Sequence, residues 1–110
     1  MSIDKSSEFT QEEQDLAAFA KAFGHPARIA ILKILAAKNA CICGEIVEVL
    51  PLAQATVSQH LKALKEAGLI QGTIDGPKSC YCINWAAFNA FKQQFTTLFS
   101  TLETGNQKCC

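Results

Sequence analysis

Apolar residues recur every three or four positions over several stretches of the chain, which is the spacing of one face of a helix. The apolar stripe of the first stretch comprises Leu16, Phe19, Ala20 and Phe23. Thr10 and Glu13 have the spacing of a capping box, in which each side chain accepts a hydrogen bond from the other residue's backbone N–H. The pattern therefore predicts a helix that begins after Thr10 and ends at Gly24.

A second helix is predicted directly after the first. His25 stands at its N-cap and Pro26 at its first helical position, where the missing backbone N–H of proline costs nothing. We expect this helix over Ala27–Ala36. Three residues are expected on one face: Ile29, Leu32 and Leu35.

The middle of the chain has the pattern of a helix-turn-helix. A short helix is expected over Gly44–Leu50, where Pro51 ends it, and a longer one over Ala55–Ala67. Gly68 is placed to end the longer helix, because glycine readily adopts the left-handed conformation of that position. The core-facing residues of the longer helix are Val57, Leu61 and Leu64. Two helices joined by a tight turn form the basic DNA-reading motif.

The rest of the pattern predicts a hairpin and a closing helix. Leu69–Ile74 and Ser79–Ile83 flank the turn residues Asp75-Gly76-Pro77-Lys78, and Trp85–Leu102 is helical. The fold class is therefore mainly α with a small β-hairpin, a winged helix-turn-helix. We expect one domain over residues 10–102, a flexible N-terminus over 1–9 and a flexible tail with cysteines over 103–110.

The closing helix carries a seam of large apolar residues at alternating spacings of three and four. The seam comprises Phe88, Phe91, Phe95, Leu98 and Leu102, with Phe99 beside it. Such a seam packs against another helix. Packing within one chain is one interpretation. We favour a homodimer through the first and last helices, because four phenylalanines exceed what so small a core covers.

Composition narrows the function without deciding it. The chain has 110 residues with ten basic and ten acidic side chains, so no strongly basic surface points to nucleic acid. Beyond Asp15, however, nine Lys and Arg face five Asp and Glu, which permits phosphate binding. No apolar run approaches the roughly 20 residues of a membrane span, and the N-terminus is too polar for a signal peptide. We expect a cytoplasmic protein with no membrane partner.

Six cysteines are an unusual number for such a protein. They fall in three close pairs: Cys41 with Cys43, Cys80 with Cys82, and Cys109 with Cys110. A disulfide framework is typical of small secreted domains, and this chain has a sufficient apolar core. Close thiol pairs in a reducing compartment indicate either a site for a soft, thiophilic ion or redox sensing.

Three stretches resemble the bacterial ArsR/SmtB family of metal- and stress-sensing repressors. They are Gly24-His-Pro-Ala-Arg-Ile-Ala-Ile-Leu32, then Thr56-Val-Ser-Gln-His-Leu-Lys-Ala-Leu-Lys-Glu-Ala-Gly-Leu-Ile70, and Tyr81-Cys-Ile-Asn84. The resemblance covers about residues 12–102. It implies a homodimer that binds a two-fold operator in double-stranded DNA and releases it when an inducer binds.

The exposed side of the longer helix supplies candidate DNA contacts. We expect the DNA-binding residues to be Gln54, Thr56, Ser58, Gln59, His60, Lys62 and Lys65, with Lys78 at the wing tip. Gln reads adenine edges, Ser and Thr reach bases or phosphates, and Lys neutralises phosphates. His60 lies at the edge of the core face, so we interpret it as structural or backbone-contacting rather than as a metal ligand. The competing interpretation is a merely solvated helix face. The chain also departs from the family pattern at the start of this helix, where Ala53 replaces the usual capping Ser or Thr and weakens the N-cap.

The cysteines bear on the inducer. Cys41-Ile-Cys43 resembles the first two positions of the Cys-x-Cys-x-x-Cys motif of arsenic-responsive members, but the third position falls on Ile46. Arsenite and antimonite prefer three thiolates, whereas an organoarsenical with one methyl group needs two. If residues 39–43 pair with 79–83, strand alternation places Cys41, Cys43, Cys80 and Cys82 on one sheet face. The tail pair, Cys109 and Cys110, is the competing source of a third sulfur.

Other functions fit the residues less well. Residues 85–102 contain no His or acidic residue, which argues against the zinc site that some members place along the last helix. A persulfide- or redox-sensing repressor of the same fold is the alternative function, and a winged helix that binds protein instead of DNA is a further one. We expect no enzyme and no permanently bound cofactor, because no phosphate loop, dinucleotide motif or carboxylate pair is present.

Overall fold

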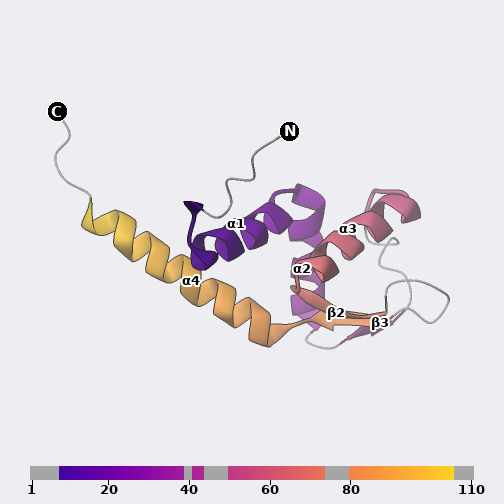
Figure 1. Cartoon of the computed structure of the whole chain (residues 1–110). Coiled ribbons are helices and arrows are strands. Elements are labelled where there is room, and N and C mark those ends of the chain that lie inside the picture. The colour runs from indigo at the N-terminus through magenta and orange to yellow at the C-terminus, as the bar shows by residue number, and fades with distance from the viewer. Residues whose placement is uncertain (1–7, 39–40, 44–49, 74–79, 106–110) are drawn as a thin grey trace, which may run out of the picture.

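The computed structural model describes residues 8–38, 41–43, 50–73 and 80–105, and Figure 1 shows how their elements are arranged. The elements are α1 (Gln11–Phe23), α2 (Pro26–Lys38), β1 (Ile42–Cys43), α3 (Gln54–Glu66), β2 (Ile70–Thr73), β3 (Cys80–Ile83) and α4 (Trp85–Thr104). The first helix of the expected helix-turn-helix and the hairpin turn fall on 44–49 and 74–79, outside the described residues. Within the described ranges, every helix is too short or too polar to cross a membrane.

The predicted boundaries of the first helix and the predicted start of the second are confirmed, whereas the second helix continues past the predicted Ala36 to Lys38. The Thr10 side chain accepts a hydrogen bond from the Glu13 backbone N–H at 3.0 Å, and the Glu13 carboxylate accepts one from the Thr10 N–H at 2.9 Å. Gly24 is the C-cap of α1. His25 Nδ1 accepts a hydrogen bond from the Ala27 N–H at 3.0 Å, so the imidazole satisfies one of the free donors at the start of α2.

The core-facing side of α2 differs from the prediction. The buried residues of α2 are Ala27, Ile31, Leu32 and Leu35. Ile29, which we expected beside Leu32 and Leu35, is 46% exposed. Apolar residues occur on nearly all sides of this helix, so its periodicity does not select one face, and tertiary packing decides.

The two ends of α3 explain how this helix is held. Ala53 is the N-cap and makes no side-chain cap hydrogen bond, as the sequence predicts. At the other end Gly68 has φ +84°, the conformation in which glycine is favoured. The N–H groups of Gly68 and Leu69 donate to the carbonyls of Lys65 and Leu64, which completes a Schellman motif. The helix therefore ends sharply and leads directly into β2.

Three strands form one antiparallel sheet in the order β1-β3-β2. Ile42 pairs with Tyr81 and Cys43 with Cys80, so the predicted pairing of the short strand with the last wing strand is confirmed for these residues. Across the hairpin, Gly72 faces Tyr81 at φ +123°, and a Cβ there would collide with the Cys80 carbonyl. Only glycine allows β2 and β3 to approach so closely.

The core lies between the sheet and the helices α2 and α3. Tyr81 is 2% and Ile83 5% exposed, so alternate residues of β3 point inward. They belong to the same buried cluster as Val57, Leu61 and Leu64 of α3. Side chains alternate along a strand, so Cys80 and Cys82 lie on the other face.

The last helix extends beyond the compact end of the molecule (Figure 1). It continues two residues past the predicted Leu102, and Asn84 caps its start by accepting from the Ala87 N–H at 3.2 Å. Phe91 is buried against Phe19 and Phe23 of α1, with ring centroids 5.1 and 5.0 Å apart. The first part of the seam thus packs within the chain, while Leu102, at 60%, is exposed.

Candidate nucleic-acid interface and thiol site

Helix α3 has an apolar side and a polar side. We call it the recognition helix, because it is the longer helix of the predicted helix-turn-helix. Val57, Leu61 and Leu64 are buried, as the sequence predicts. The exposed or half-buried polar residues are Gln54, Thr56, Ser58, Gln59, Lys62, Lys65 and Glu66. Amide, hydroxyl and ammonium groups on one helix face can read base edges and neutralise phosphates in a major groove. Lys78 lies outside the described residues.

His60 is the candidate DNA residue that the structure places inward. It is 9% exposed, and its Nδ1 accepts a hydrogen bond from Arg28 Nε at 3.1 Å. The His25 and His60 rings are 4.3 Å apart between centroids. Burial first, and then the nearby His25 and Arg28, lower the pKa of His60 below its usual 6.5. The placement agrees with the structural role that the sequence suggested.

Arg28 is a residue that the sequence reasoning did not single out. Its guanidinium connects α2 to α3 through His60 and also donates to the Ala22 carbonyl at 3.4 Å. Arg28 and His60 are 32 positions apart in the chain. Arg28 is part of a stretch that carries the family resemblance, but a single sequence does not reveal a pair so far apart.

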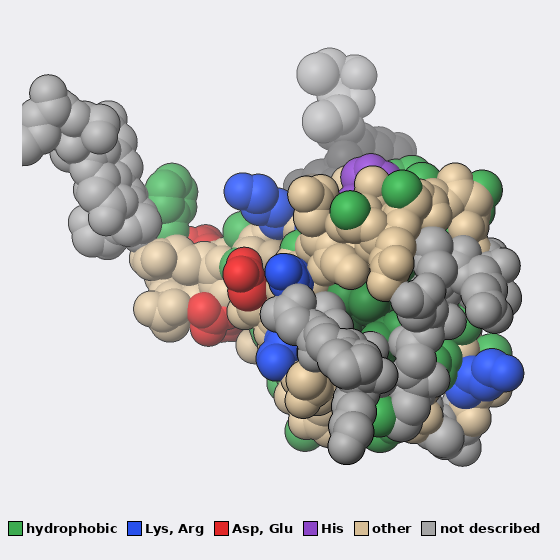
Figure 2. Space-filling view, turned by 90° about the vertical axis from the view of Figure 1, so that its right-hand side faces the viewer, with side chains coloured by type: hydrophobic (Ala, Val, Ile, Leu, Met, Phe, Trp, Pro, Cys, Tyr) green, Lys and Arg blue, Asp and Glu red, His purple; other side chains and the backbone are tan. Residues whose placement is uncertain are grey.

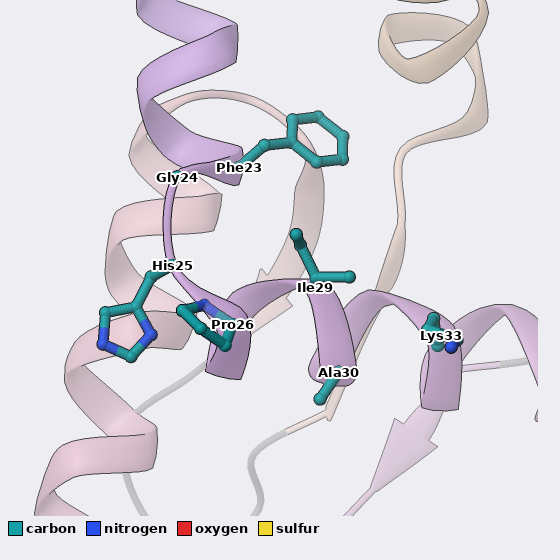
Figure 3. Close-up of a pocket in the computed structure, with 7 residues that line it drawn as sticks. All are labelled: Phe23, Gly24, His25, Pro26, Ile29, Ala30 and Lys33. Carbon is teal, nitrogen blue, oxygen red and sulfur yellow. The ribbon is translucent and has the colours of Figure 1, made fainter.

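The turn between α1 and α2 borders an open hollow of about 470 Å³ (Figure 3). Phe23 and Ile29 face each other on one side of it, and the His25 ring lies toward α3. The lining has a single charged side chain, Lys33. The hollow is open to solvent beside the turn that joins α1 and α2, and His25 and Lys33 are the ionisable side chains in its lining.

Charged side chains are unevenly placed on the face drawn in Figure 2. Acidic side chains appear only toward the projecting part of the molecule, whereas Lys and Arg side chains appear both beside them and at the opposite edge. This agrees with the charge asymmetry of the sequence, in which acidic residues gather near the N-terminus. Positive charge near the recognition helix favours contact with a phosphate backbone.

Three of the described cysteines, Cys41, Cys80 and Cys82, are in disulfides. Cys41, which precedes β1, and Cys82 of β3 form a disulfide, with Cα atoms 4.3 Å apart. The β1–β3 register brings them directly opposite each other. Cys41 is exposed and Cys82 half-buried. We call these two residues the strand thiol pair.

The other cysteines are described less fully. The backbone of Cys43 lies opposite that of Cys80, and the Cys80 side chain also has a partner. Cys109 and Cys110 lie outside the described residues. Among the residues that the structure does describe, no group of three His, Cys, Asp or Glu is arranged to hold a metal ion. Cys41 and Cys82 of the predicted four-cysteine cluster are therefore joined and Cys80 is likewise in a disulfide, whereas the donor set of an inducer site stays a prediction.

Comparison with known proteins gives this arrangement a family. Residues 25–71 match the model described as bacterial regulatory protein, arsR family. An uncharacterised HTH-type transcriptional regulator from Methanocaldococcus jannaschii is 42% identical over 64 residues, which cover 57% of this chain and 71% of that protein. The chain belongs to the ArsR family. It is thus a DNA-binding transcriptional repressor of the ArsR/SmtB type and not an enzyme.

Further ArsR-family proteins match over most of the chain. The arsenical resistance operon repressor of Staphylococcus aureus is 28% identical over 96 residues, covering 87% of this chain and 88% of that repressor. An ArsR-like transcriptional regulator from Rhodococcus sp. RHA1 superposes with a TM-score of 0.69 at 19% identity, over 86% of this chain and 89% of that structure. The structural match confirms the winged helix-turn-helix fold of this ArsR-family chain.

Proposed function

We propose that this ArsR-family repressor binds operator DNA as a homodimer and releases it when a thiophilic inducer binds the strand cysteines. The inducer class is trivalent arsenic or antimony, or an organoarsenical. The observation that carries the proposal is the β1–β3 register, which sets Cys41 against Cys82 and Cys43 against Cys80. Soft ions select such paired thiolates over oxygen and nitrogen donors. A relative named as an arsenical resistance operon repressor supports this inducer class.

The number of sulfurs decides which arsenical fits. In the reduced protein the strand thiol pair supplies two thiolates, the number that a methylated arsenical needs. Arsenite and antimonite take three. The backbone register sets Cys43 opposite Cys80 close along the strands to the pair, and we propose them as the source of a third sulfur. Cys109 and Cys110 are the competing source.

The DNA-binding part of the proposal assigns the contacts to the polar side of α3. Gln59, Lys62 and Lys65 are exposed there and lie on the side opposite the buried residues. His60 holds the helix in place through Arg28. In a homodimer two such helices enter successive major grooves, so the distance between them must match the operator.

The proposed coupling runs through β3. Cys82 faces outward, while its neighbours Tyr81 and Ile83 pack in the core beside the buried residues of α3. Two thiolates bound to one ion at about 2.3 Å each are held more than about 3 Å apart. Drawing both thiolates onto one ion fixes their separation, shifts β3 against β1 and moves α3 within the dimer. A shift of this kind lowers affinity for an operator that requires both helices in register.

Substitution of a strand cysteine tests the proposal. Cys41→Ser leaves the polar side of α3 intact, so we expect DNA affinity within about twofold of wild type and loss of arsenite-induced release, which weakens DNA binding at least about tenfold in wild type. Fluorescence anisotropy of the reduced protein on duplex DNA from upstream of its own gene measures both.

The double variant Cys109→Ser/Cys110→Ser is the control, because it removes both tail thiols and leaves the strand cysteines intact. It retains release if the strand cysteines form the site. Release that survives in Cys41→Ser but disappears in the tail variant contradicts the proposal. Reduced wild-type protein that ignores arsenite contradicts the inducer class altogether.

The disulfide favours one alternative function, a thiol-based persulfide or redox sensor of the same fold. In that function oxidation of cysteines itself weakens DNA binding. Its specific observation is the bond between Cys41 and Cys82. A DNA titration of the oxidised protein tests this alternative, because it predicts a loss of affinity on oxidation without any inducer.

A further inference from the structure

The strand thiol pair is placed so that its disulfide demands little movement of the backbone. Residues directly opposite in an antiparallel pair without mutual hydrogen bonds have Cα atoms about 4.5 Å apart. The Cα atoms of Cys41 and Cys82 are 4.3 Å apart with the bond in place. The neighbouring pairs, Ile42 with Tyr81 and Cys43 with Cys80, keep the regular register. The bond therefore joins two residues that the sheet already holds side by side.

In the disulfide-bonded chain, the described part of the DNA-binding unit keeps its arrangement, with α3 packed on the sheet. Tyr81 and Ile83 remain buried on the inner face of β3, while the disulfide lies on the outer face. The hairpin register from Ile70 with Ile83 to Thr73 with Cys80 is intact. The polar residues of α3 stay exposed or half-buried. The fold that superposes on an ArsR-like regulator is thus the fold of the disulfide-bonded form.

Disulfide formation and inducer binding exclude each other chemically. A soft ion binds negatively charged thiolates. The sulfurs of a disulfide are neutral, so the disulfide-bonded pair does not supply this ligand. The two states also space the sulfurs differently, at about 2.05 Å in a disulfide and more than about 3 Å across a bound ion. Only the ion-bound state places a further atom between the two sulfurs.

We propose that oxidation of Cys41 and Cys82 to a disulfide produces a form of the repressor that still binds DNA and no longer responds to the inducer. This inference rests on the proposed function for the identity of the inducer. The oxidant class is a hydroperoxide. Oxidative conditions then keep the regulated genes repressed even when a thiophilic inducer is present.

The reaction has two steps. The exposed Cys41 thiolate attacks the outer peroxide oxygen, which forms a sulfenic acid on Cys41 and releases an alcohol. The Cys82 thiolate then attacks that sulfur, forms the disulfide and releases hydroxide, which a proton converts to water. Overall two thiols and one hydroperoxide give one disulfide, one alcohol and one water. The thiols lose two electrons and the peroxide gains them.

The test compares reduced and oxidised full-length protein. One sample is reduced with a phosphine, the other is treated with cumene hydroperoxide, and peptide mass mapping locates the bond. We expect the oxidised protein to bind upstream duplex DNA within about twofold of the reduced protein, and arsenite to change its affinity by less than about twofold. Phosphine treatment restores the arsenite response. Oxidised protein that loses DNA at least about tenfold overturns the proposal and supports the redox alternative.

A second readout separates this inference from the proposed function. Phenylarsine oxide bridges two nearby thiols. In the variant Cys43→Ser/Cys80→Ser/Cys109→Ser/Cys110→Ser, where Cys41 and Cys82 are the remaining cysteines, we expect one equivalent to bind the reduced protein and much less to bind the oxidised protein. Cys82→Ser cannot form the bond, so peroxide leaves its mass map without a Cys41–Cys82 link. If the reduced protein remains bound to DNA when arsenite is added, the proposed function is wrong. The uptake of phenylarsine oxide and the DNA affinity of the oxidised protein still test this inference in that case. Equal uptake by both forms overturns it.

Discussion

At the scale of single residues, the contact between Arg28 and His60 couples the second helix to the recognition helix. The neutral imidazole accepts the Arg28 hydrogen bond on Nδ1 and packs against His25. A protonated His60 has no acceptor there and places a positive charge beside the guanidinium. The position of α3 therefore depends on one imidazole remaining neutral.

This dependence predicts a pH effect on stability. Burial, His25 and Arg28 lower the pKa of His60 in the folded chain, while unfolded His60 titrates near 6.5. The contribution is fully present above that value. As pH falls below it, the unfolded chain binds a proton that the folded chain resists, and stability decreases. Urea unfolding from about pH 7.5 to about pH 5.5 should show a steeper loss for wild type than for His60→Gln. Equal slopes contradict the assignment.

At the scale of elements, α3 has a strong end and a weak end. Its C-terminus closes with a Schellman motif at Gly68, whereas its N-terminus begins at Ala53, whose side chain accepts no hydrogen bond. The Ala53 backbone, with φ −68° and ψ 149°, already has the extended conformation of a capping residue. The site lacks only an oxygen.

Supplying that oxygen should stabilise the protein. Ala53→Ser is expected to raise the free energy of unfolding by about 1 kcal/mol, because the hydroxyl accepts a free N–H of the first turn. Ala55→Ser is the matched control, since it adds the same hydroxyl at an exposed position inside α3. Urea denaturation measures both variants. A gain of the same size in Ala55→Ser shows that capping is not the cause.

At the scale of the whole molecule, α4 is longer than the body it packs against. Phe91 contacts α1, but Phe99 and Leu102 remain 55% and 60% exposed. Along this seam lies an open hollow of about 340 Å³ lined by five phenylalanines, Lys92 and Thr96. Exposed aromatic surface continuous with a helix seam is what a second copy of the chain would cover. The proposed homodimer follows from this surface.

Charge on the seam should separate the dimer. Phe99→Glu/Leu102→Glu places two carboxylates in the proposed interface, so we expect a monomer by sedimentation and a loss of DNA affinity of about a hundredfold or more, because two half-sites no longer bind together. Gln93→Glu is the control, since Gln93 is exposed and its helical position is opposite the seam. A dimer that survives the double substitution rules out this interface.

How far the sequence predicts the structure depends on the range of the interactions. Capping at Thr10 and His25 and the glycine at 68 involve neighbours in the chain, and all three are confirmed. The outward direction of Cys41 and Cys82 follows from strand alternation, which is also local. The buried side of α2 and the Arg28–His60 contact depend on which helices meet, and no local pattern encodes that.

The link between Cys41 and Cys82 makes a ring of the chain between them. The two cysteines are 41 positions apart, and the ring contains the whole of α3 and β2 and most of β3. A protease that cuts once inside the ring opens it but releases no fragment until the disulfide is reduced. In the proposed inducer complex, an arsenic atom bound to the same two sulfurs would close the same ring with one more atom. The oxidised form and the proposed inducer complex would then be rings that differ by a single atom, with α3 inside both.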